Sequence, residues 1–303
     1  MLSTIVERHV ALRHATGYLF RRQADMLRDY ARFAEAHGED VVRAATALAW
    51  AGNVPSMSTR HVRLGVIRRF ASLMHAEDPR HEIPPDGVFG QKPPRRAPYI
   101  YSDREVRELL KAAGKLGPPG GLRPKMYATM FGLLAATGMR ISEVLKLRLS
   151  DITPPGLLVR ETKFRKSRLV PLHSTTQREL DSYLEARAEI AYVDDTVFVS
   201  ERGTALSYPT VVTVFLSLVR GMGIHPGVGQ RGPRIHDLRH TFAVRSLERC
   251  AGNRDAISRH MVALSTYLGH AHLYDTYWYL QATPALLADI AGRAELLALG
   301  GTP

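Results

Sequence analysis

Two residues suited to phosphoryl transfer lie close together in the stretch IHDLRHTFA. His236 and Arg239 are three residues apart, a spacing that places both side chains on one face of a helix. A histidine that moves a proton beside an arginine that binds a phosphate is the pairing expected for this chemistry. One alternative stays open, because His236 and His240 have the i, i+4 spacing of zinc ligands. Arg239 argues against that alternative, since it would place a cation beside the metal.

A second candidate for anion binding is Arg140 in ATGMRISEVLKL. It follows a break at Gly138 and is expected near the beginning of a helix. There a guanidinium and backbone N–H groups can face one anion together. Glu143, one turn later, is close enough to hold the guanidinium in place. Taken alone, the pair is better explained as an ordinary surface ion pair.

Basic residues crowd the stretch ETKFRKSRLVPL. Alternating apolar residues around it predict a β-hairpin within residues 156–173. Its tip carries Lys163, Arg165, Lys166 and Arg168. Like charges repel unless a polyanion neutralises them, so the hairpin is predicted to enter a groove of DNA.

The stretch LGHAHLYDTYWYL, residues 268–280, contains two histidines, three tyrosines and one tryptophan. Its composition is typical of a packed aromatic helix, but it also allows a histidine metal site or a nucleophilic tyrosine. The local sequence does not distinguish these three interpretations.

The overall composition favours a polyanionic partner. The formal net charge is +12 and the sequence pI is about 10.0, with most of the positive charge on arginine, which binds phosphates bidentately. A single cysteine, Cys250, excludes an intrachain disulfide and indicates a reducing, intracellular compartment. No apolar run approaches the length of a membrane span, and the N-terminus does not have the pattern of a signal peptide.

The proline-rich region at residues 81–99 predicts a boundary between two domains. Residues 1–90 show helical periodicity, with an apolar stripe formed by Leu19, Met26, Leu27, Tyr30 and Phe33. A later predicted helix carries four arginines that are interpreted as a phosphate-contacting face: Arg60, Arg63, Arg68 and Arg69.

Residues 91–99 are assigned to the linker and residues 100–303 to the second domain. Ser102 and Glu105 predict a capping box at its first helix. Further helical stretches surround the hairpin and one short strand. The fold class is therefore mainly α, with a helical N-terminal domain followed by a mostly α domain that contains a small antiparallel sheet.

Taken together, the four stretches resemble the tyrosine site-specific recombinases, also called the phage-integrase family. The order Arg, hairpin Lys, His-x-x-Arg, Leu-Gly-His and Tyr is that family's signature, and the resemblance covers about residues 100–295. The N-terminal half is similar to the family's core-binding, SAM-like domain. Two positions depart from the pattern, Ile235 where the family often has Pro, and Leu280 where it has a small polar residue.

The resemblance implies a site-specific DNA recombinase of the integrase, transposase or resolvase type. It cleaves and rejoins DNA through a covalent 3′-phosphotyrosine, with no metal or other cofactor. Tyr279, nine residues after His270, matches the nucleophile, and Tyr274 and Tyr277 are then expected to be packed, supporting aromatics. The catalytic residues implied are Arg140, Lys163, His236, Arg239, His270 and Tyr279. Lower-ranked candidates for DNA contact are Arg60, Arg63, Arg68, Arg69, Arg165, Lys166 and Arg168.

The implied partners are double-stranded DNA with a specific recombination site and further copies of the chain in a tetrameric synapse. A helix at residues 284–299 is expected to be exchanged between protomers. Whether a second recombinase or an accessory protein takes part stays open. The implied location is the cytoplasm, in association with the nucleoid. Two alternatives remain, a catalytically silent DNA-binding protein of the same fold and a metal hydrolase that uses His236 and His240.

Overall fold

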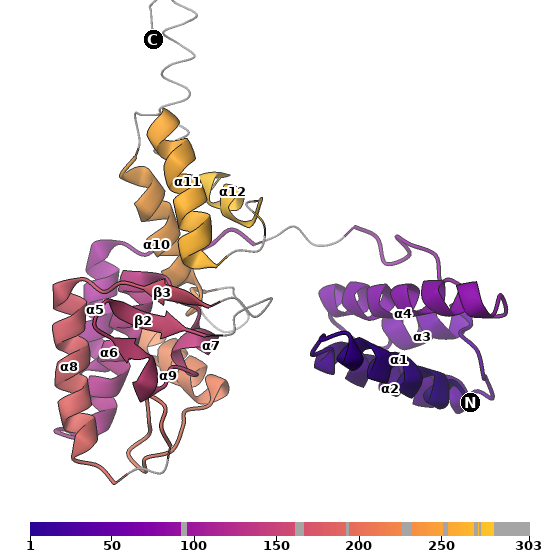
Figure 1. Cartoon of the computed structure of the whole chain (residues 1–303), viewed down its shortest axis with the longest axis horizontal. Helices are drawn as coiled ribbons and strands as arrows, with labels where there is room; N and C mark the ends of the chain where they lie inside the picture. The colour runs from indigo at the N-terminus through magenta and orange to yellow at the C-terminus, as the bar shows by residue number, and fades with distance from the viewer. Residues whose placement is uncertain are drawn as a thin grey trace, which may run out of the picture. The chain divides into compact units, whose positions relative to one another are not determined.

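The computed structural model forms two compact units, Met1–Arg96 and Ala97–Pro303 (Figure 1). Each unit is described by itself. The residues that the structure describes are 1–91, 96–160, 167–191, 194–225, 232–250, 254–269, 272 and 274–281.

The N-terminal unit contains the helices α1 (Leu2–Ala15), α2 (Arg21–Glu35), α3 (Ala44–Gly52) and α4 (Met57–Glu77). Residues buried at helical spacing on these four helices pack into one core. Leu27 and Tyr30 belong to this core, as the apolar stripe predicted. The prediction for Leu19 was wrong, because Leu19 precedes α2 in the turn after α1 and is 76% exposed.

The C-terminal unit is mostly helical, with one small sheet. Its helices are α5 (Asp103–Ala113), α6 (Leu122–Thr137), α7 (Ile141–Val144), the 3₁₀ helix η1 (Leu149–Asp151), α8 (Ser174–Ala188), α9 (Tyr208–Gly221), α10 (Asp237–Glu248), α11 (Arg254–Leu268) and α12 (Tyr274–Gln281). The strands are β1 (Ile152–Thr153), β2 (Gly156–Val159) and β3 (Arg168–Val170), which pair antiparallel in the order β1-β2-β3. The predicted fold class is confirmed.

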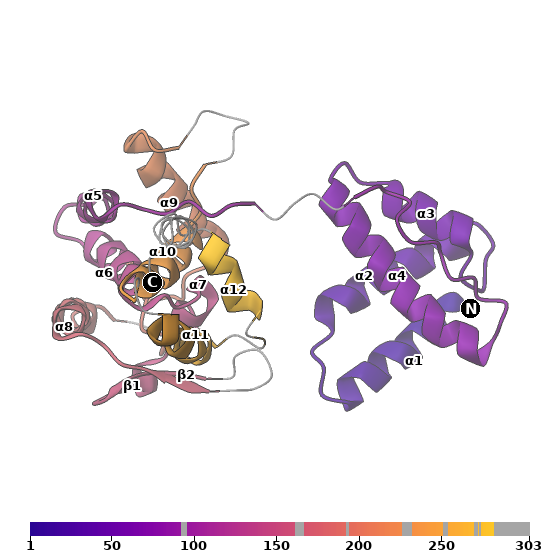
Figure 2. The ribbon, with the colours of Figure 1, turned by 90° about the horizontal axis from the view of Figure 1, so that it is seen from above.

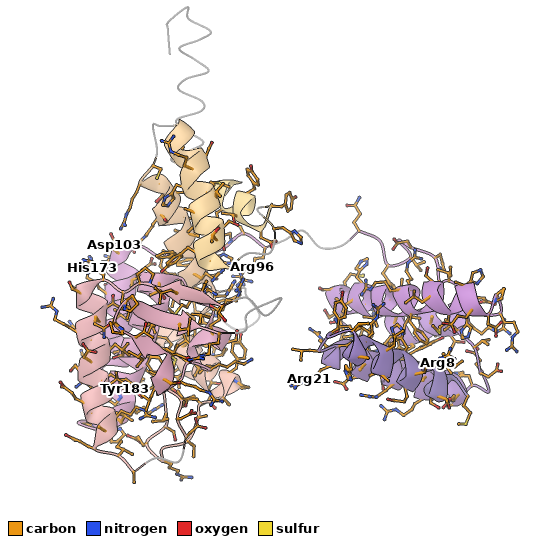
Figure 3. All side chains as sticks on the ribbon, viewed as in Figure 1. Arg8, Arg21, Arg96, Asp103, His173 and Tyr183 are labelled. Carbon is orange, nitrogen blue, oxygen red and sulfur yellow. The ribbon has the colours of Figure 1, made fainter. Side chains whose placement is uncertain are left out.

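Helix α6 packs against α5, α8 and α10 in the large core of this unit (Figure 2). Tyr183 of α8 is fully buried there, and its hydroxyl donates to the Val197 carbonyl at 3.1 Å (Figure 3). A smaller cluster joins α10, α11 and α12. Ser102 and Glu105 form the predicted capping box at the beginning of α5. In the part of the chain described, no helix is long and apolar enough to cross a membrane.

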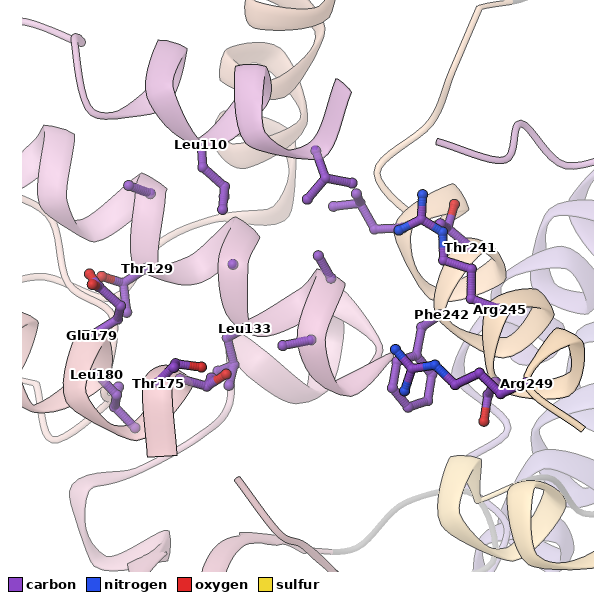
Figure 4. A pocket seen from close by; sticks show the side chains of 18 residues that line it. Leu110, Thr129, Leu133, Thr175, Glu179, Leu180, Thr241, Phe242, Arg245 and Arg249 are labelled. Carbon is purple, nitrogen blue, oxygen red and sulfur yellow. The ribbon is translucent and has the colours of Figure 1, made fainter. Parts of the chain in front are cut away.

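A groove of about 750 Å³ lies among α5, α6, α8 and α10 (Figure 4). Leu110, Leu133 and Phe242 give it apolar walls, while Glu179 on α8 and Arg249 after α10 lie at its two sides. It is separate from the arginine site described below, although α10 borders both.

Gly138 ends α6 and directs the chain toward Arg140. Its backbone is left-handed, with φ 62°, and a Cβ placed on it would lie 2.5 Å from Cδ1 of Phe242. Both features require glycine, because an L side chain is strained at this φ and the ring leaves no space for a methyl group.

We expect Gly138→Ala to lower the free energy of unfolding by about 1–3 kcal/mol, since it adds backbone strain and a steric clash. Urea unfolding followed by tryptophan fluorescence and circular dichroism measures this. Gly221→Ala is the matched control, because Gly221 has an ordinary φ and open space around its Cα. Equal unfolding midpoints for the two variants would contradict the requirement for glycine at position 138.

Candidate active site

The carboxylate of Glu143 is the centre of an ion-pair network at the beginning of α7. Its Oε1 accepts from Nη1 of Arg140 at 2.8 Å and from Nη1 of Arg168 at 3.0 Å. Its Oε2 accepts from the backbone N–H of Arg140 at 2.9 Å and from Nη2 of Arg168 at 2.7 Å. Arg168 therefore binds Glu143 with both ends of its guanidinium, while Arg140 uses its side chain and its main chain.

Glu143 remains ionised despite being 8% exposed. Burial alone would raise the pKa of its carboxyl group, but the hydrogen bonds from Arg168 and from the Arg140 backbone, together with both positive charges, lower the pKa to about 2. The pair with Arg140 is thus more than the ordinary surface ion pair that the local sequence favoured. Arg140 keeps 29% of its side chain exposed, so it remains accessible to an anion.

Arg239 is the second arginine of the site, and it lies on α10 with 2% exposure. Its Nη1 donates to the Gly138 carbonyl and its Nη2 to the Leu268 carbonyl, each at 2.7 Å. Burial and the charge of Arg140 lower the pKa of Arg239 to about 10, which leaves it cationic at neutral pH. Arg239 thus connects the end of α6 to the end of α11.

The turn after α11 joins these two arginines. Arg140 donates from Nη2 to the Gly269 carbonyl at 3.2 Å, next to the Leu268 carbonyl that Arg239 binds. Gly269 has a left-handed φ of 66°, and a Cβ on it would lie 3.0 Å from Nη1 of Arg168. His270 is the next residue in the sequence but lies outside the described residues.

His236 lies at the N-terminal end of α10 and is exposed. The pKa of His236 is lowered below its ordinary value. The main cause is desolvation by the protein atoms around the ring, and the positive charges of Arg239 and Arg234 add to it. Its imidazole is therefore neutral at pH 7 and able to accept a proton. The ring of His240 packs edge-on against it, with centroids 4.7 Å apart.

Tyr279 lies on α12 and is 2% exposed, packed in the small cluster with residues of α10 and α11. Its ring centroid is 5.5 Å from that of His240. The expectation that Tyr274 and Tyr277 are packed was wrong, because they are 82% and 50% exposed and do not belong to this cluster. Among the three tyrosines of the stretch, only Tyr279 is buried beside the arginine site.

Three of the arginines predicted to contact DNA from α4 are instead half-buried and donate to backbone carbonyls of their own unit. Arg60 binds Val54 at 2.7 Å, Arg63 binds Trp50 at 3.1 Å, and Arg68 binds Pro84. Of the four, Arg69 is the exposed one. The internal hydrogen bonds of the other three leave less of their surface open to solvent, and contact of the four arginines with DNA stays a prediction.

Arg168 is also turned inward, because its side chain is 12% exposed and bound to Glu143. The strand pattern contained a signal for this placement, since Arg168 alternates with the exposed Leu169 and shares a face with the buried Val170. Several predicted features lie outside the described residues: Lys163, Arg165, Lys166, His270 and the helix at 284–299.

The metal alternative rests on His236 and His240 alone. Within the described ranges, no three His, Cys, Asp or Glu side chains gather in a way that could bind a metal ion. The nearest carboxylate is that of Asp237, whose Oδ1 lies 4.0 Å from Nε2 of His240 and 2.8 Å from Nη2 of Arg234.

Two arginines thus lie beside a buried tyrosine in a mostly helical unit with a small antiparallel sheet. Residues 101–285 match the Phage integrase family. The chain is 36% identical over 300 residues to a putative integrase/recombinase, y4rB, of Sinorhizobium fredii, covering 96% of both chains. It is 30% identical over 244 residues to the tyrosine recombinase XerD of Oceanobacillus iheyensis, covering 79% of this chain and 75% of the relative.

A solved structure supports the same fold. The Tn1549 transposon integrase in complex with transposon right end DNA superposes with a TM-score of 0.70 at 15% identity, over 99% of both chains. The chain belongs to the phage integrase family. It is a tyrosine site-specific recombinase, an enzyme that breaks and rejoins DNA.

The depressed pKa of Glu143 predicts a pH-dependent contribution to stability. The carboxyl group has a pKa of about 2 in the folded protein, against an ordinary value of 4.5 in the unfolded chain. It therefore stabilises the fold above pH 4.5, and this contribution is lost as the pH falls toward 2. We expect the difference in free energy of unfolding between wild type and Glu143→Gln to shrink by about 2 kcal/mol from pH 6 to pH 3. Urea titrations at both pH values measure it. Glu179→Gln, at an exposed position on α8, serves as the control, and a Glu143 difference independent of pH would refute the assignment.

Proposed function

We propose that Tyr279 is the nucleophile and that Arg140 and Arg239 bind the scissile phosphate. The observation that supports this most is their convergence from separate elements. Arg140 precedes α7, Arg239 lies on α10, and both bind carbonyls of the turn that joins α11 to the region of Tyr279. Residues up to 139 positions apart in the sequence therefore contribute to one anion site.

In the proposed step, the Tyr279 hydroxyl oxygen attacks phosphorus in line with the departing 5′ oxygen. The P–O5′ bond breaks while the new bond from tyrosine to phosphorus forms. The tyrosine proton passes to the neutral His236, and Lys163 protonates the 5′ oxygen. Arg140 and Arg239 stabilise the negative charge that grows on the nonbridging oxygens, and His270 donates a hydrogen bond to one of them. The 3′-phosphotyrosine keeps the energy of the bond, so a 5′ hydroxyl can rejoin the strand by the reverse step.

The burial of Tyr279 adds a requirement to this mechanism. At 2% exposure its hydroxyl is out of reach of a duplex. Helix α12 must therefore shift relative to α10 before the oxygen can approach a phosphate bound by Arg140. Because Tyr279 packs in the small cluster of α10, α11 and α12, this shift leaves the large core intact.

The groove among α5, α6, α8 and α10 is the proposed receptor for the helix at 284–299 of a neighbouring copy. That segment combines a leucine-rich stripe with Asp289, Arg293 and Glu295. The groove has apolar walls and carries charges of both signs, the exposed Arg249 at one side and the exposed Glu179 at the other. The exchange would link protomers in a synaptic tetramer on DNA. The biological setting proposed is the integration, transposition or resolution of DNA in the nucleoid.

Tyr279→Phe is expected to abolish covalent capture of DNA while it retains DNA binding. The substrate is a nicked duplex whose sequence is obtained from DNA that remains attached to wild-type protein after denaturation of cell extracts. Adduct formation is followed on denaturing gels in the presence of EDTA. Tyr277→Phe, two residues earlier on α12 and 50% exposed, is the matched control. Adducts that persist in Tyr279→Phe would exclude this nucleophile, and dependence on zinc would support the hydrolase.

The N-terminal unit is proposed to bind the DNA backbone through cations that are not used internally. Arg8, Arg28, Arg32 and Arg43 take part in ion pairs with acidic side chains of the unit. Among the described residues, Arg21, Arg22 and Arg69 are exposed and in no ion pair. Figure 3 shows Arg21 at the beginning of α2, beside the turn that carries the exposed Tyr18 and Leu19.

We expect the double substitution of Arg21 and Arg22 by glutamine to weaken DNA binding and to reduce the slope of log K against log salt by about 1–2, one per lost phosphate contact. Fluorescence anisotropy at several salt concentrations measures the slope. Arg28→Gln is the control, because Arg28 is bound bidentately by Glu7. An unchanged slope in the double variant would remove this surface from the DNA interface.

A further inference from the structure

Arg168 occupies a different place from that expected of a hairpin residue that contacts DNA. It lies at the beginning of β3, opposite Val159 of β2, and is turned to the inner face of the sheet. Its guanidinium binds both oxygens of Glu143, at 3.0 and 2.7 Å. With 12% exposure and both Nη atoms bound to Glu143, it offers little surface to a phosphate.

We propose that Arg168 is a positioning residue of DNA cleavage, which acts on the scissile phosphate through Glu143 and Arg140. Glu143 receives two hydrogen bonds from each arginine. The direction of its carboxylate is fixed by the fork of Arg168, and that direction in turn fixes both the main chain and the guanidinium of Arg140. A lysine at position 168 would keep the charge but offer no planar fork.

Arg168 also affects the electrostatics of the site. Arg140, Arg168 and Arg239 are three cations around the single described anion of this network, Glu143. Without Arg168, the negative charge of Glu143 would be directed at Arg140 alone and would cancel its attraction for phosphate. Arg168 thus compensates Glu143 and leaves the field of Arg140 and Arg239 available to a second anion.

Arg168 also lies close to the turn after α11. Gly269 lies so close that a Cβ on it would be 3.0 Å from Nη1 of Arg168 and 3.4 Å from its Cζ. The carbonyl of the same residue accepts from Arg140. Gly269 is therefore enclosed by both arginines, and the position where the chain continues to His270 depends on Arg168 as well.

The experiment measures binding and cleavage separately, on the nicked duplex captured with the wild-type enzyme. Arg168→Gln is expected to slow single-turnover adduct formation at saturating enzyme by about 100-fold. Arg168→Lys should recover part of the loss and be slower than wild type by about tenfold. The dissociation constant and its salt slope should stay within about twofold of wild type, because no phosphate contact is removed. Thermal midpoints are recorded for every variant, and Arg178→Gln, at an exposed position on α8, controls for loss of one positive charge.

A double-mutant cycle tests whether Arg168 acts through Glu143. If it does, the double variant Glu143→Gln/Arg168→Gln forms the adduct at most about threefold more slowly than the slower of the two single variants. Multiplication of the two losses would overturn the proposal, as would a wild-type rate in Arg168→Gln. A weakened, less salt-dependent binding with an unchanged rate would identify Arg168 as a phosphate contact instead. Absence of any adduct with the wild-type enzyme would refute the proposed catalytic function itself, which separates the two failures.

Discussion

The buried carboxylate of Glu143 is the constraint on which the site depends. A buried anion is costly unless opposite charges and hydrogen bonds surround it, and Glu143 receives four hydrogen bonds from two arginines. Those arginines come from different elements, one before α7 and one at the beginning of β3. Compensation of one charge therefore fixes the position of the sheet relative to the end of α6, and it does so at the place where a phosphate is to bind.

Two glycines allow the arginines to approach the backbone so closely. Gly138 and Gly269 both have left-handed φ, and each presents or adjoins a carbonyl that an arginine binds. Arg239 uses one carbonyl at the end of α6 and another at the end of α11. Hydrogen bonds to backbone carbonyls hold a guanidinium without neutralising it, because a carbonyl carries no net charge. The site thus orders its cations while keeping their attraction for an anion.

The sequence allowed prediction of the elements and of the residues with the most regular spacing. The capping box of α5, the hairpin and the proximity of Arg140 to Glu143 follow from local rules, because each involves partners within a few residues. The inward turn of Arg168 and of Arg63 depends on partners in other elements, distant in the sequence. Glu143 lies 25 residues before Arg168, and Arg63 binds the carbonyl of Trp50 on another helix. A charge pattern shows how many cations a helix carries, but not which of them are neutralised inside the protein.

The residues of the site belong to two separate hydrophobic cores. This separation affects when cleavage can occur. Arg140 and its partners are fixed to the large core through α6, α7 and β3. Tyr279 belongs to the smaller cluster of α10, α11 and α12. Described hydrogen bonds between the two parts include those from Arg140 to the Gly269 carbonyl, from Arg239 to the Gly138 carbonyl, and between Tyr101 and residues Thr241 and Arg245 of α10. In the proposed mechanism, helix α12 changes its position while Arg140 and Arg239 stay in place, so that Tyr279 is withheld from solvent until a phosphate is bound. This order of events restricts cleavage to DNA that is already bound. An enzyme that holds a broken strand through a covalent bond to itself requires that restriction.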